Sequence, residues 1–372
     1  MLFTLKKLAL LALVALHGPA RRCPERPQRV IVVQQAKLGD MICTTPVFAA
    51  LKRTYTDLHL AVMGNRVNED VLRGNPHVDR YLVFTDFRSA LKEVRKGGFD
   101  TGIVTGPDFV SIALLILAGV GCVIAPSIEK GVTPLANSLY RSLLRFVVSL
   151  PHEEGTYAPG QYLRLLEPLG IHTTDTTKVL AYTPSAHATA ATYLKSIGER
   201  PKLLVGMTPS AGNTVKEWPP ERFAAIADHL ISTYGAKVIV LGTKAERSKI
   251  DAMLEQVKEK QDVIDAGGRF DIEELKALIA ALDLFIAADT GPMYIAEAFK
   301  VPTVDIVGPV DERIQPPQGP LHRVVIPPRS RPAQVTVLNA KWYDREEARK
   351  QAEATTVAAV IREVDDLIAS MK

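Results

Sequence analysis

The stretch Arg29-Val30-Ile31-Val32-Val33-Gln34 decides the fold class of this chain. It is a nearly continuous β-branched run, typical of a strand buried on both faces of a parallel sheet. A similar run, Lys202-Leu203-Leu204-Val205-Gly206-Met207, opens the second half of the chain. After each run, short apolar strands alternate with helical patterns, which predicts parallel βαβ units. We therefore predict an α/β protein of two Rossmann-like, doubly wound domains.

The other predicted elements follow this alternation in both halves of the chain. A helix is expected to begin near Pro46, because proline suits the first helical turn, and the Pro- and Arg-rich stretch 311–335 is expected to be irregular. Further strands are predicted at 58–63, 80–84, 99–104, a short one ending near Ala125, 236–241, 262–265, 283–287 and 302–307. Further helices are predicted at 88–96, 109–118, 160–169, 184–197, 219–234, 245–258, 271–281, 292–299 and 355–370.

The length of 372 residues suits two domains. We divide the chain into an N-terminal apolar and basic segment (1–27) and two Rossmann-like domains (28–175 and 201–340). A bridge (176–200) joins the two domains, and a C-terminal helix (341–372) follows the second. Two doubly wound domains that face a central cleft would bind ligands at the carboxyl ends of their strands. The loops after the first strands are therefore the places to look for a site.

Composition gives few further clues. Hydrophobic residues make up 47% of the chain and the net charge is only +4, which gives no reason to expect a nucleic-acid partner. The three cysteines are widely spaced and include no Cys-x-x-Cys pair, so neither a disulfide framework nor a zinc site is predicted. This pattern is typical of a reducing compartment.

The N-terminus allows two interpretations. Lys6 and Lys7 precede an apolar stretch that ends in Gly18-Pro19-Ala20, which resembles a signal peptide. The stretch is short, however, and arginines follow it at once, which favours the cytoplasmic side. We predict a short amphipathic helix on the inner leaflet, with its basic residues on anionic lipid. The uncharged run 109–128 is interrupted by Gly119 and Gly121, and is predicted to be buried rather than membrane-spanning.

Three loops carry the chemistry-bearing residues. The first, Lys37-Leu38-Gly39-Asp40, follows the opening strand. Gly39 allows a tight turn or the close approach of a ligand. Asp40 could act as a general base for an acceptor hydroxyl. It could equally cap the following helix, and spacing alone favours the cap.

The second loop runs from Thr208 to Pro219 and follows the first strand of the second half. Its small polar residues, glycine and lysine make a plausible phosphate cradle, in which Lys216 would offset the negative charge. A solvent-exposed loop is the alternative. The polar residues expected to face phosphate are Ser210, Asn213 and Thr214.

The third loop, Ala288-Asp289-Thr290-Gly291-Pro292, lies between an apolar strand and a helix. A Thr-Gly turn at a helix N-terminus is an anion site by geometry and dipole. Capping by Asp289 or Thr290 is the alternative.

The sequence has no Gly-x-Gly-x-x-Gly, Walker, Asp-x-Asp or Gly-x-Ser-x-Gly motif. These absences argue against dinucleotide, P-loop, metal-diphosphate and α/β-hydrolase chemistry.

Taken together and in order, these segments resemble glycosyltransferase family 9, the ADP-heptose:lipopolysaccharide heptosyltransferases. The resemblance covers roughly residues 28–310. The matching segments are Leu38-Gly39-Asp40, Thr45-Pro46 through Leu51-Lys52, Asn75-Pro76-His77-Val78-Asp79, Tyr162-Leu163-Arg164-Leu165-Leu166 with Leu169-Gly170, Pro209-Ser210-Ala211, Lys216-x-Trp218-Pro219 and Asp289-Thr290-Gly291-Pro292-Met293.

The resemblance implies a GT-B fold and inverting, metal-independent transfer of heptose from ADP-heptose to the lipopolysaccharide inner core, without a cofactor. It implies an acceptor domain at 28–175, a donor domain at 201–340 and a cytoplasmic location, peripheral on the inner membrane. Asp40 matches the family's general base and Lys216 the lysine on the diphosphate. The loop of Asp289, Thr290 and Gly291 matches the one that holds the donor sugar and diphosphate.

One position departs from the family pattern. The family usually has a histidine three residues after the glycine of the third loop, where this chain has Tyr294. A tyrosine can donate to a phosphate oxygen but carries no positive charge at neutral pH. Two alternatives therefore stay open: another nucleotide-sugar donor or surface-polysaccharide acceptor, or a membrane-surface binding protein with a degenerate site.

Overall fold

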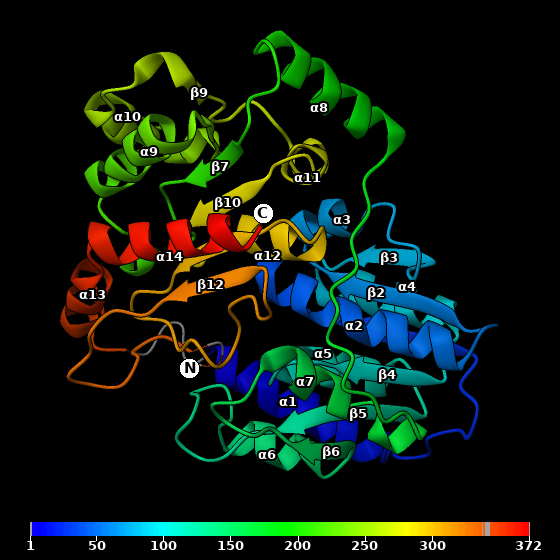
Figure 1. The fold of residues 1–372 in the computed structure, drawn as a ribbon. Helices are drawn as coiled ribbons and strands as arrows, with labels where there is room; N and C mark the ends of the chain where they lie inside the picture. The colour runs from blue at the N-terminus through cyan, green and yellow to red at the C-terminus, as the bar shows by residue number, and fades with distance from the viewer. Residues whose placement is uncertain (1, 337, 339–342, 372) are drawn as a thin grey trace. The chain divides into compact units, whose positions relative to one another are not determined.

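The computed structural model describes residues 2–336, 338 and 343–371, with the side chains of residues 2–4 excepted. The chain divides into two compact units, Met1–Val179 and Leu180–Lys372. Each unit is built on a six-stranded sheet (Figure 1). The boundary falls within the range 176–200 that we assigned to the bridge. The prediction of two Rossmann-like α/β domains is confirmed.

All strands of unit 1 run parallel, in the order β3-β2-β1-β4-β5-β6. This is the doubly wound order, whose topological switch point lies between β1 and β4. The strands are β1 (Arg29–Val33), β2 (His59–Gly64), β3 (Arg80–Val83), β4 (Thr101–Val104), β5 (Cys122–Ser127) and β6 (Val148–Pro151).

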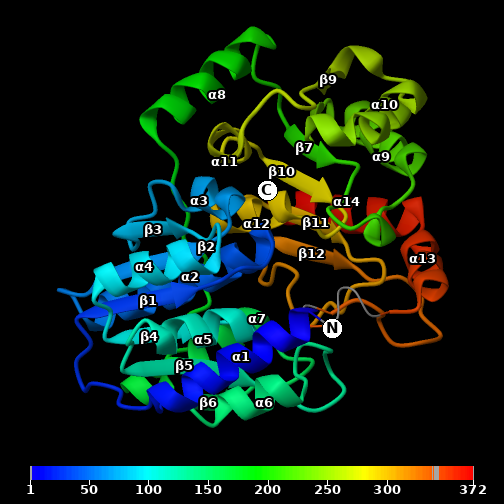
Figure 2. The same cartoon turned by 180° about the vertical axis from the view of Figure 1, so that it is seen from behind.

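Helices cover both faces of the unit 1 sheet. On one face α5 packs against α4 and α6, and α1 lies over α5 and α6; on the other α2 packs against α3 and α7 (Figures 1 and 2). The helices are α1 (Leu2–His17), α2 (Leu38–Thr54), α3 (Arg66–Leu72), α4 (Phe87–Gly97), α5 (Phe109–Leu117), α6 (Ser138–Leu144), α7 (Ala158–Arg164) and the 3-10 helix η1 (Glu167–Leu169).

Unit 2 repeats the same parallel arrangement in the order β12-β11-β10-β7-β8-β9. Its switch point lies between β7 and β10. The strands are β7 (Leu204–Thr208), β8 (Lys237–Val240), β9 (Val263–Asp265), β10 (Leu284–Ala287), β11 (Thr303–Ile306) and β12 (His322–Val325). The helices are α8 (Pro184–Ser196), α9 (Pro220–Tyr234), α10 (Arg247–Gln256), α11 (Ile272–Ile279), α12 (Gly291–Ala298), α13 (Arg345–Ala354) and α14 (Val357–Ser370), with 3-10 turns η2 (Thr214–Lys216), η3 (Lys244–Glu246) and η4 (Lys260–Asp262).

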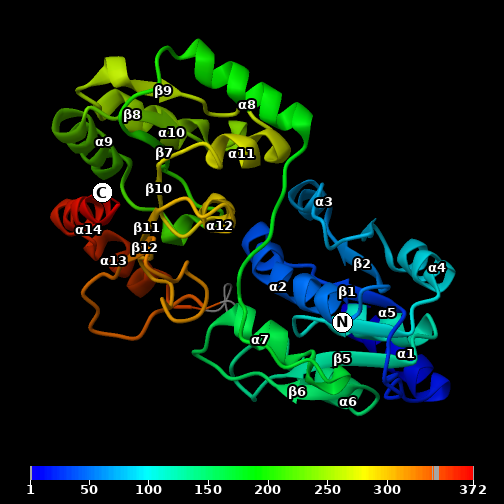
Figure 3. The same cartoon turned by 45° about the vertical axis from the view of Figure 1, so that its right-hand side comes forward.

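The apolar stripe predicted for the last helix packs into the core of unit 2. Val360, Val364 and Ile368 of α14 join a buried cluster with residues of α9 and of strands β7, β8, β10 and β11. Figure 3 shows α9 and α14 on one side of this sheet and α11 and α12 on the other. The polar helix α13 was not predicted as a separate element, because its sequence carries few apolar residues to reveal a period.

The prediction that the second helix begins near Pro46 is wrong. Helix α2 begins at Leu38, and Pro46 lies inside it. A proline there cannot donate to the carbonyl four residues earlier. The hydroxyl of Thr45 donates to that Ile42 carbonyl instead, at 2.8 Å. This replacement bond explains why the helix continues through the proline.

The structure also tests the predictions for the stretches 311–335 and 109–128. The stretch 311–335 is not wholly irregular, since β12 lies within it and pairs with β11. The apolar run 109–128 forms the buried helix α5 and strand β5, as predicted, although β5 continues to Ser127. No helix among the described residues combines the length and apolarity needed to cross a membrane.

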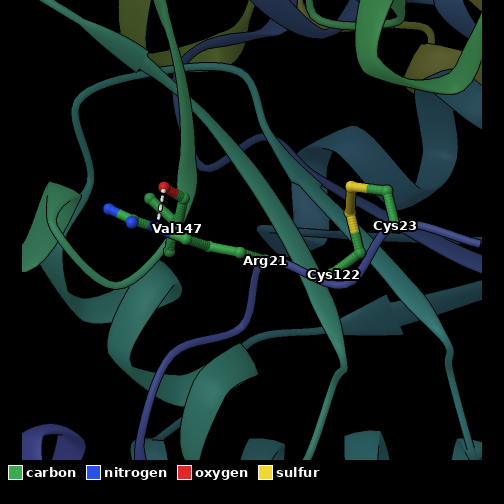
Figure 4. Close-up of a disulfide and its surroundings, with 4 residues drawn as sticks. All are labelled: Arg21, Cys23, Cys122 and Val147. Atoms are coloured by element: carbon green, nitrogen blue, oxygen red, sulfur yellow. Dashed lines mark hydrogen bonds between the residues drawn. A yellow bond between two sulfur atoms is a disulfide. The ribbon is translucent and has the colours of Figure 1, made fainter.

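The prediction that the cysteines do not form a disulfide is also wrong, and the expectation of a reducing compartment, which was drawn from the cysteine spacing, thereby loses its basis. Cys23 and Cys122 are joined by a disulfide with their Cα atoms 4.6 Å apart (Figure 4). The segment after α1 runs beside the start of β5, and the backbone N–H of Arg22 donates to the Gly121 carbonyl at 3.0 Å. The Arg21 guanidinium donates to the Val147 carbonyl at 3.1 Å (Figure 4). Only the folded chain brings these segments together, across 99 residues of sequence.

Candidate functional site

Two of the three predicted loops flank the switch point of unit 2. The loop after β7 leads through Asn213 into η2, which ends at Lys216. The loop after β10 contains Asp289 and leads into α12. Because β7 and β10 are neighbouring parallel strands, both loops emerge from the same edge of the sheet, where open α/β sheets bind ligands.

The loop after β7 is anchored at its far end by Trp218. This side chain is fully buried, and its indole N–H donates to the Thr355 carbonyl at 2.9 Å. Its ring meets Phe223 of α9 edge-on, with the ring centroids 5.0 Å apart. A buried aromatic with a satisfied N–H is a rigid support. Lys216 therefore stands only two residues from a fixed point.

Lys216 and Tyr294 both bind the carboxylate of Asp289. The ammonium of Lys216 pairs with Asp289 Oδ2, and the Tyr294 hydroxyl donates to Asp289 Oδ1 at 2.5 Å. The Lys216 side chain is 19% exposed, whereas that of Asp289 is 1% exposed. The Lys216 side chain is therefore partly exposed, whereas Asp289 is buried. The two predicted loops thus share one buried charge cluster, formed by Lys216, Asp289 and Tyr294.

The backbone at Asp289 is unusual. Its φ of 26° lies on the positive side, which non-glycine residues seldom occupy. Its N–H donates to Asp305 Oδ1 at 2.8 Å, and Asp305 on β11 is fully buried. Burial and the neighbouring Asp289 carboxylate raise the pKa of Asp305 well above its usual value. Sequence reasoning missed Asp305, although an aspartate within the apolar strand 302–307 was a visible signal.

The start of α12 does not support the simple capping alternative for Thr290. Thr290 is the N-cap residue, and within the described part of the chain its side chain makes no capping hydrogen bond. The Asp289 carboxylate does not act as a cap either in these contacts, because its two oxygens bind Lys216 and Tyr294. Thr290 and Gly291 are half-buried at the first turn. The helix dipole favours an anion at this end, but Pro292 has no N–H and the Met293 N–H donates to the Thr290 carbonyl at 3.0 Å.

The side chains of the remaining predicted residues of the second loop make other contacts, although the Lys216 backbone N–H donates to the Asn213 carbonyl at 2.9 Å. Ser210 is fully buried and donates to Glu246 Oε1 at 2.7 Å. Asn213 and Thr214 line a recess of about 760 Å³ whose lining includes neither Lys216 nor Asp289. Glu246 was missed, although its Thr-x-x-Glu spacing with Thr243 is typical of a capping box.

Asp40 stands in the first turn of α2 in unit 1, three residues after the N-cap Lys37. Its Oδ2 accepts a hydrogen bond from the Lys37 backbone N–H at 3.2 Å. Asp40 therefore does contribute to the cap of α2, as the alternative interpretation expected. Gly39 is buried in the same turn, and Asp40 is half-buried. This position follows β1 directly, at the switch point of the unit 1 sheet.

Polar residues surround Asp40. The Thr44 hydroxyl donates to the Asp40 carbonyl at 2.8 Å, and the Gln34 amide donates to Thr44 Oγ1 at 3.3 Å. Burial, and then the charge of Asp40, raise the pKa of Tyr162 well above its usual value, so this phenol stays neutral. Asp40 thus lies in a fixed polar turn close to a buried, uncharged tyrosine.

The structure places Lys216, Asp289 and Tyr294 together in unit 2, and it places Asp40 after the first strand of unit 1. Within the ranges that the structure describes, no group of three or more His, Cys, Asp or Glu side chains is placed to hold a metal ion. Two doubly wound α/β units are the architecture of the GT-B fold class.

Comparison with known proteins identifies the family. Residues 89–341 match the model of glycosyltransferase family 9 (heptosyltransferase), and the chain belongs to this family. It is therefore a glycosyltransferase. Lipopolysaccharide heptosyltransferase 3 of Escherichia coli K12 is 25% identical over 284 residues, which cover 73% of this chain and 80% of that protein. Lipopolysaccharide heptosyltransferase 2 of the same strain is 23% identical over 316 residues, or 80% and 87% of the two chains.

Solved structures agree on the fold. A glycosyltransferase family 9 protein from Veillonella parvula superposes with a TM-score of 0.73 at 20% identity, covering 95% of this chain and 99% of the other. The ADP-heptose lipopolysaccharide heptosyltransferase II of E. coli gives a TM-score of 0.72 at 18% identity, covering 92% and 99%. The GT-B fold is thereby confirmed.

Proposed function

We propose that this chain is an inverting, metal-independent heptosyltransferase that transfers heptose from ADP-heptose to the inner core of lipopolysaccharide. The observation that carries the proposal is the contact of Lys216 with Asp289 beside the start of α12. An accessible ammonium next to a helix N-terminus is suited to a diphosphate. Two similar proteins are lipopolysaccharide heptosyltransferases and one solved neighbour is an ADP-heptose enzyme, which supports the choice of substrate.

In the proposed reaction, unit 2 binds the donor. Lys216 contacts the diphosphate oxygens, and the first turn of α12 at Thr290 and Gly291 faces the same group. Asp289 holds the lysine from behind and fixes the loop that meets the donor sugar. Because Lys216 supplies positive charge and the sequence has no Asp-x-Asp pair, the leaving diphosphate is stabilised without a divalent ion.

Asp40 of unit 1 is the proposed general base. Its carboxylate takes the proton from the acceptor hydroxyl, and that oxygen attacks the anomeric carbon. The bond between this carbon and the diphosphate oxygen breaks, and ADP leaves with the electron pair. Attack opposite to the leaving group inverts the anomeric configuration. The hydrogen bond from the Lys37 backbone N–H holds Asp40 Oδ2 in the first turn of α2.

Isothermal calorimetry with ADP, UDP and GDP, without added metal, tests the donor assignment. The proposal predicts binding of ADP in preference to the other two. Selective binding of UDP or GDP would keep the enzyme class but exclude heptose carried by ADP. If none of the three nucleotides binds, the result would contradict the proposed heptosyltransferase and favour the alternative of a membrane-surface binding protein with a degenerate site.

Tyr294 supports a second candidate, the same fold with another donor or another surface-polysaccharide acceptor. Its hydroxyl is spent on Asp289, and the ring is buried. A histidine at this position could carry positive charge toward the diphosphate, which the tyrosine does not. We therefore expect weaker electrostatic attraction to the diphosphate than in a histidine-bearing relative. The nucleotide panel separates this candidate from the first.

We further propose that the enzyme works as a peripheral protein at the cytoplasmic surface of the inner membrane, where α1 touches the lipid. Four leucines of α1 are exposed on the side opposite the buried Val14. Their spacing places them on one helical stripe, which suits burial in an anionic bilayer interface beside the exposed Lys6. These leucines are Leu5, Leu8, Leu13 and Leu16.

Some basic residues assigned to lipid in the sequence prediction contact the protein instead. Lys7 lies over the ring of Phe109, 5.4 Å from its centroid, and Arg21 bonds the Val147 carbonyl. Flotation with anionic liposomes therefore tests the leucines directly. We expect a variant with Leu13→Glu and Leu16→Glu to lose flotation, while Leu321→Glu, at an exposed apolar position of unit 2, retains it. Equal flotation of both variants would exclude the α1 contact.

A further inference from the structure

We infer that Asp305 is a positioning residue of the donor loop: its buried carboxyl group holds the Asp289 backbone in the turn that directs the Asp289 side chain toward Lys216 and Tyr294. The inference deepens the proposed function and rests on it for its link to donor binding. Asp305 itself is fully buried, so it acts through Asp289 and not on the substrate.

The first observation is the place of Asp305 in the sheet. It lies on β11, where its register partner on β10 is Ala287. The chain turns out of β10 two residues later, at Asp289. Asp305 Oδ1 accepts the N–H of Asp289 at 2.8 Å inside the protein. Backbone groups buried at the end of a strand need a partner, and a neighbouring side chain supplies it here.

The second observation is the conformation that this bond holds. Asp289 has a φ of 26°, and positive φ values are disfavoured for residues with a Cβ. Such residues persist only where their surroundings determine them strongly. Three contacts do so: Asp305 binds the backbone N–H, and Lys216 and Tyr294 bind the carboxylate. Without the bond to Asp305, the Asp289 backbone could leave this conformation, and the Asp289 carboxylate would then no longer be held toward Lys216 and Tyr294.

The third observation concerns the charge of Asp305. Its Oδ2 has no hydrogen-bond partner among the described residues. The charged groups that face it are Asp289, Lys216 and Glu297. Burial and then the Asp289 carboxylate raise its pKa well above the usual value, against smaller opposing effects of the Asp289 N–H hydrogen bond and of Lys216. A neutral carboxyl group here avoids a second negative charge beside Asp289 and still accepts its N–H.

The neutral form makes a discriminating variant available. Asp305→Asn keeps an oxygen acceptor of the same shape without a group that ionises, whereas Asp305→Leu keeps the branching at Cγ but is larger and removes the acceptor. We expect Asp305→Asn to behave like the wild type and Asp305→Leu to loosen the loop. A matched control is Asp283→Leu. Asp283 also binds a backbone N–H, that of Leu204 at 2.8 Å, but stands just before β10 at its opposite end.

Hydrogen exchange of residues 284–294, followed by mass spectrometry, tests the inference without any ligand. We expect the Asp289 amide to exchange at least about tenfold faster in Asp305→Leu than in the wild type, as for a lost buried hydrogen bond. Asp305→Asn and Asp283→Leu should leave it protected. Unchanged exchange in a folded Asp305→Leu would overturn the inference. If that variant does not fold, fast exchange in Asp305→Asn would overturn it.

ADP affinity separates this inference from the proposed function. We expect Asp305→Leu to weaken ADP binding at least about tenfold while Asp305→Asn stays within about twofold. A wild type that does not bind ADP, but whose loop loosens in Asp305→Leu, would reject the proposed donor and keep the positioning role. Loosening of the loop with unchanged ADP affinity would overturn the link to donor binding.

The pH dependence gives a readout that a purely structural residue would not change. Because the folded-state pKa of Asp305 is raised, its contribution to stability is full below the unfolded-state pKa and is lost as pH rises through the folded-state pKa. The wild-type loop should therefore exchange faster at high pH, after correction for intrinsic exchange, and Asp305→Asn should not. Parallel pH profiles in both proteins would contradict a neutral Asp305.

Discussion

The hydroxyl of Tyr294 donates a 2.5 Å hydrogen bond to Asp289 Oδ1, while Lys216 holds the other oxygen of the same carboxylate. The aspartate is thus held between a neutral donor on α12 and a cation at the end of η2. Only Lys216 retains appreciable exposure. The position at which the family usually carries a histidine therefore serves here to support the carboxylate behind the lysine.

Removal of this hydroxyl should weaken nucleotide binding. Hydrogen bonds to charged groups contribute about 1.5–3 kcal/mol to stability, so Tyr294→Phe should lower the free energy of unfolding by about that amount. Because Asp289 then loses one of the two groups that position it beside Lys216, we also expect ADP affinity to fall by about tenfold. The control is Tyr234→Phe, because Tyr234 donates to Asp365 at 2.8 Å in another part of unit 2. Calorimetry measures both. A larger loss in Tyr234→Phe than in Tyr294→Phe would contradict the assigned role.

Lys216→Ala should chiefly affect the diphosphate. The variant loses the accessible cation and leaves the buried Asp289 without its charge partner, so its stability should fall as well. We expect ADP affinity to fall at least about tenfold, compared at equal folded fraction. Lys249→Ala is the control, because Lys249 pairs with the nearby Glu217 at 2.8 Å but stands on α10. Equal ADP affinity in wild type and Lys216→Ala would refute the diphosphate contact.

Asp40→Asn should separate catalysis from folding. The asparagine still offers an oxygen to the Lys37 N–H, so the first turn of α2 should remain intact. A side chain that cannot take a proton should lower kcat by about a hundredfold or more, with little change in ADP affinity or Tm. Asp86→Asn, at the N-cap of α4, is the matched control. Turnover near the wild-type value in Asp40→Asn would reject the base.

The disulfide should contribute to the stability of unit 1. Cys23 and Cys122 close a long loop, and loop-closure entropy gives bridges of this kind about 2–4 kcal/mol. We expect Cys23→Ser to lower the free energy of unfolding by about that amount in oxidising buffer. In strong reductant the variant and the wild type should differ little. Equal stability under oxidising conditions would show that Cys23 and Cys122 are not bridged in solution.

The fold was predictable because buried parallel strands have a strong local signature. The runs at Val30–Val33 and at Leu203–Val205 lie in β1 and at the start of β7, and the strands predicted around them match closely. The start of α2 could not be predicted from Pro46. A proline usually marks the first turn of a helix, and the sequence does not show that the Thr45 hydroxyl bonds the Ile42 carbonyl and so lets the helix include Pro46. Residues 345–354 lack the apolar period that would have revealed α13.

The candidate site was predicted loop by loop, but not as an arrangement. Lys216 and Asp289 lie 73 residues apart, and no local pattern gives the distance between their side chains. Asp305 became interpretable only when the sheet order placed β11 beside β10. The disulfide was missed for the same reason, since Cys122 opens a strand that only the fold brings against Cys23.

The most direct test of the central claim is turnover of ADP-heptose by the wild-type chain on a lipopolysaccharide inner-core acceptor, with a chelator present. The account predicts that each ADP released matches one heptose attached, with inverted anomeric configuration, and that Asp40→Asn abolishes most of both. Transfer from a UDP or GDP sugar with none from ADP-heptose, or transfer that stops when the chelator is added, would contradict it.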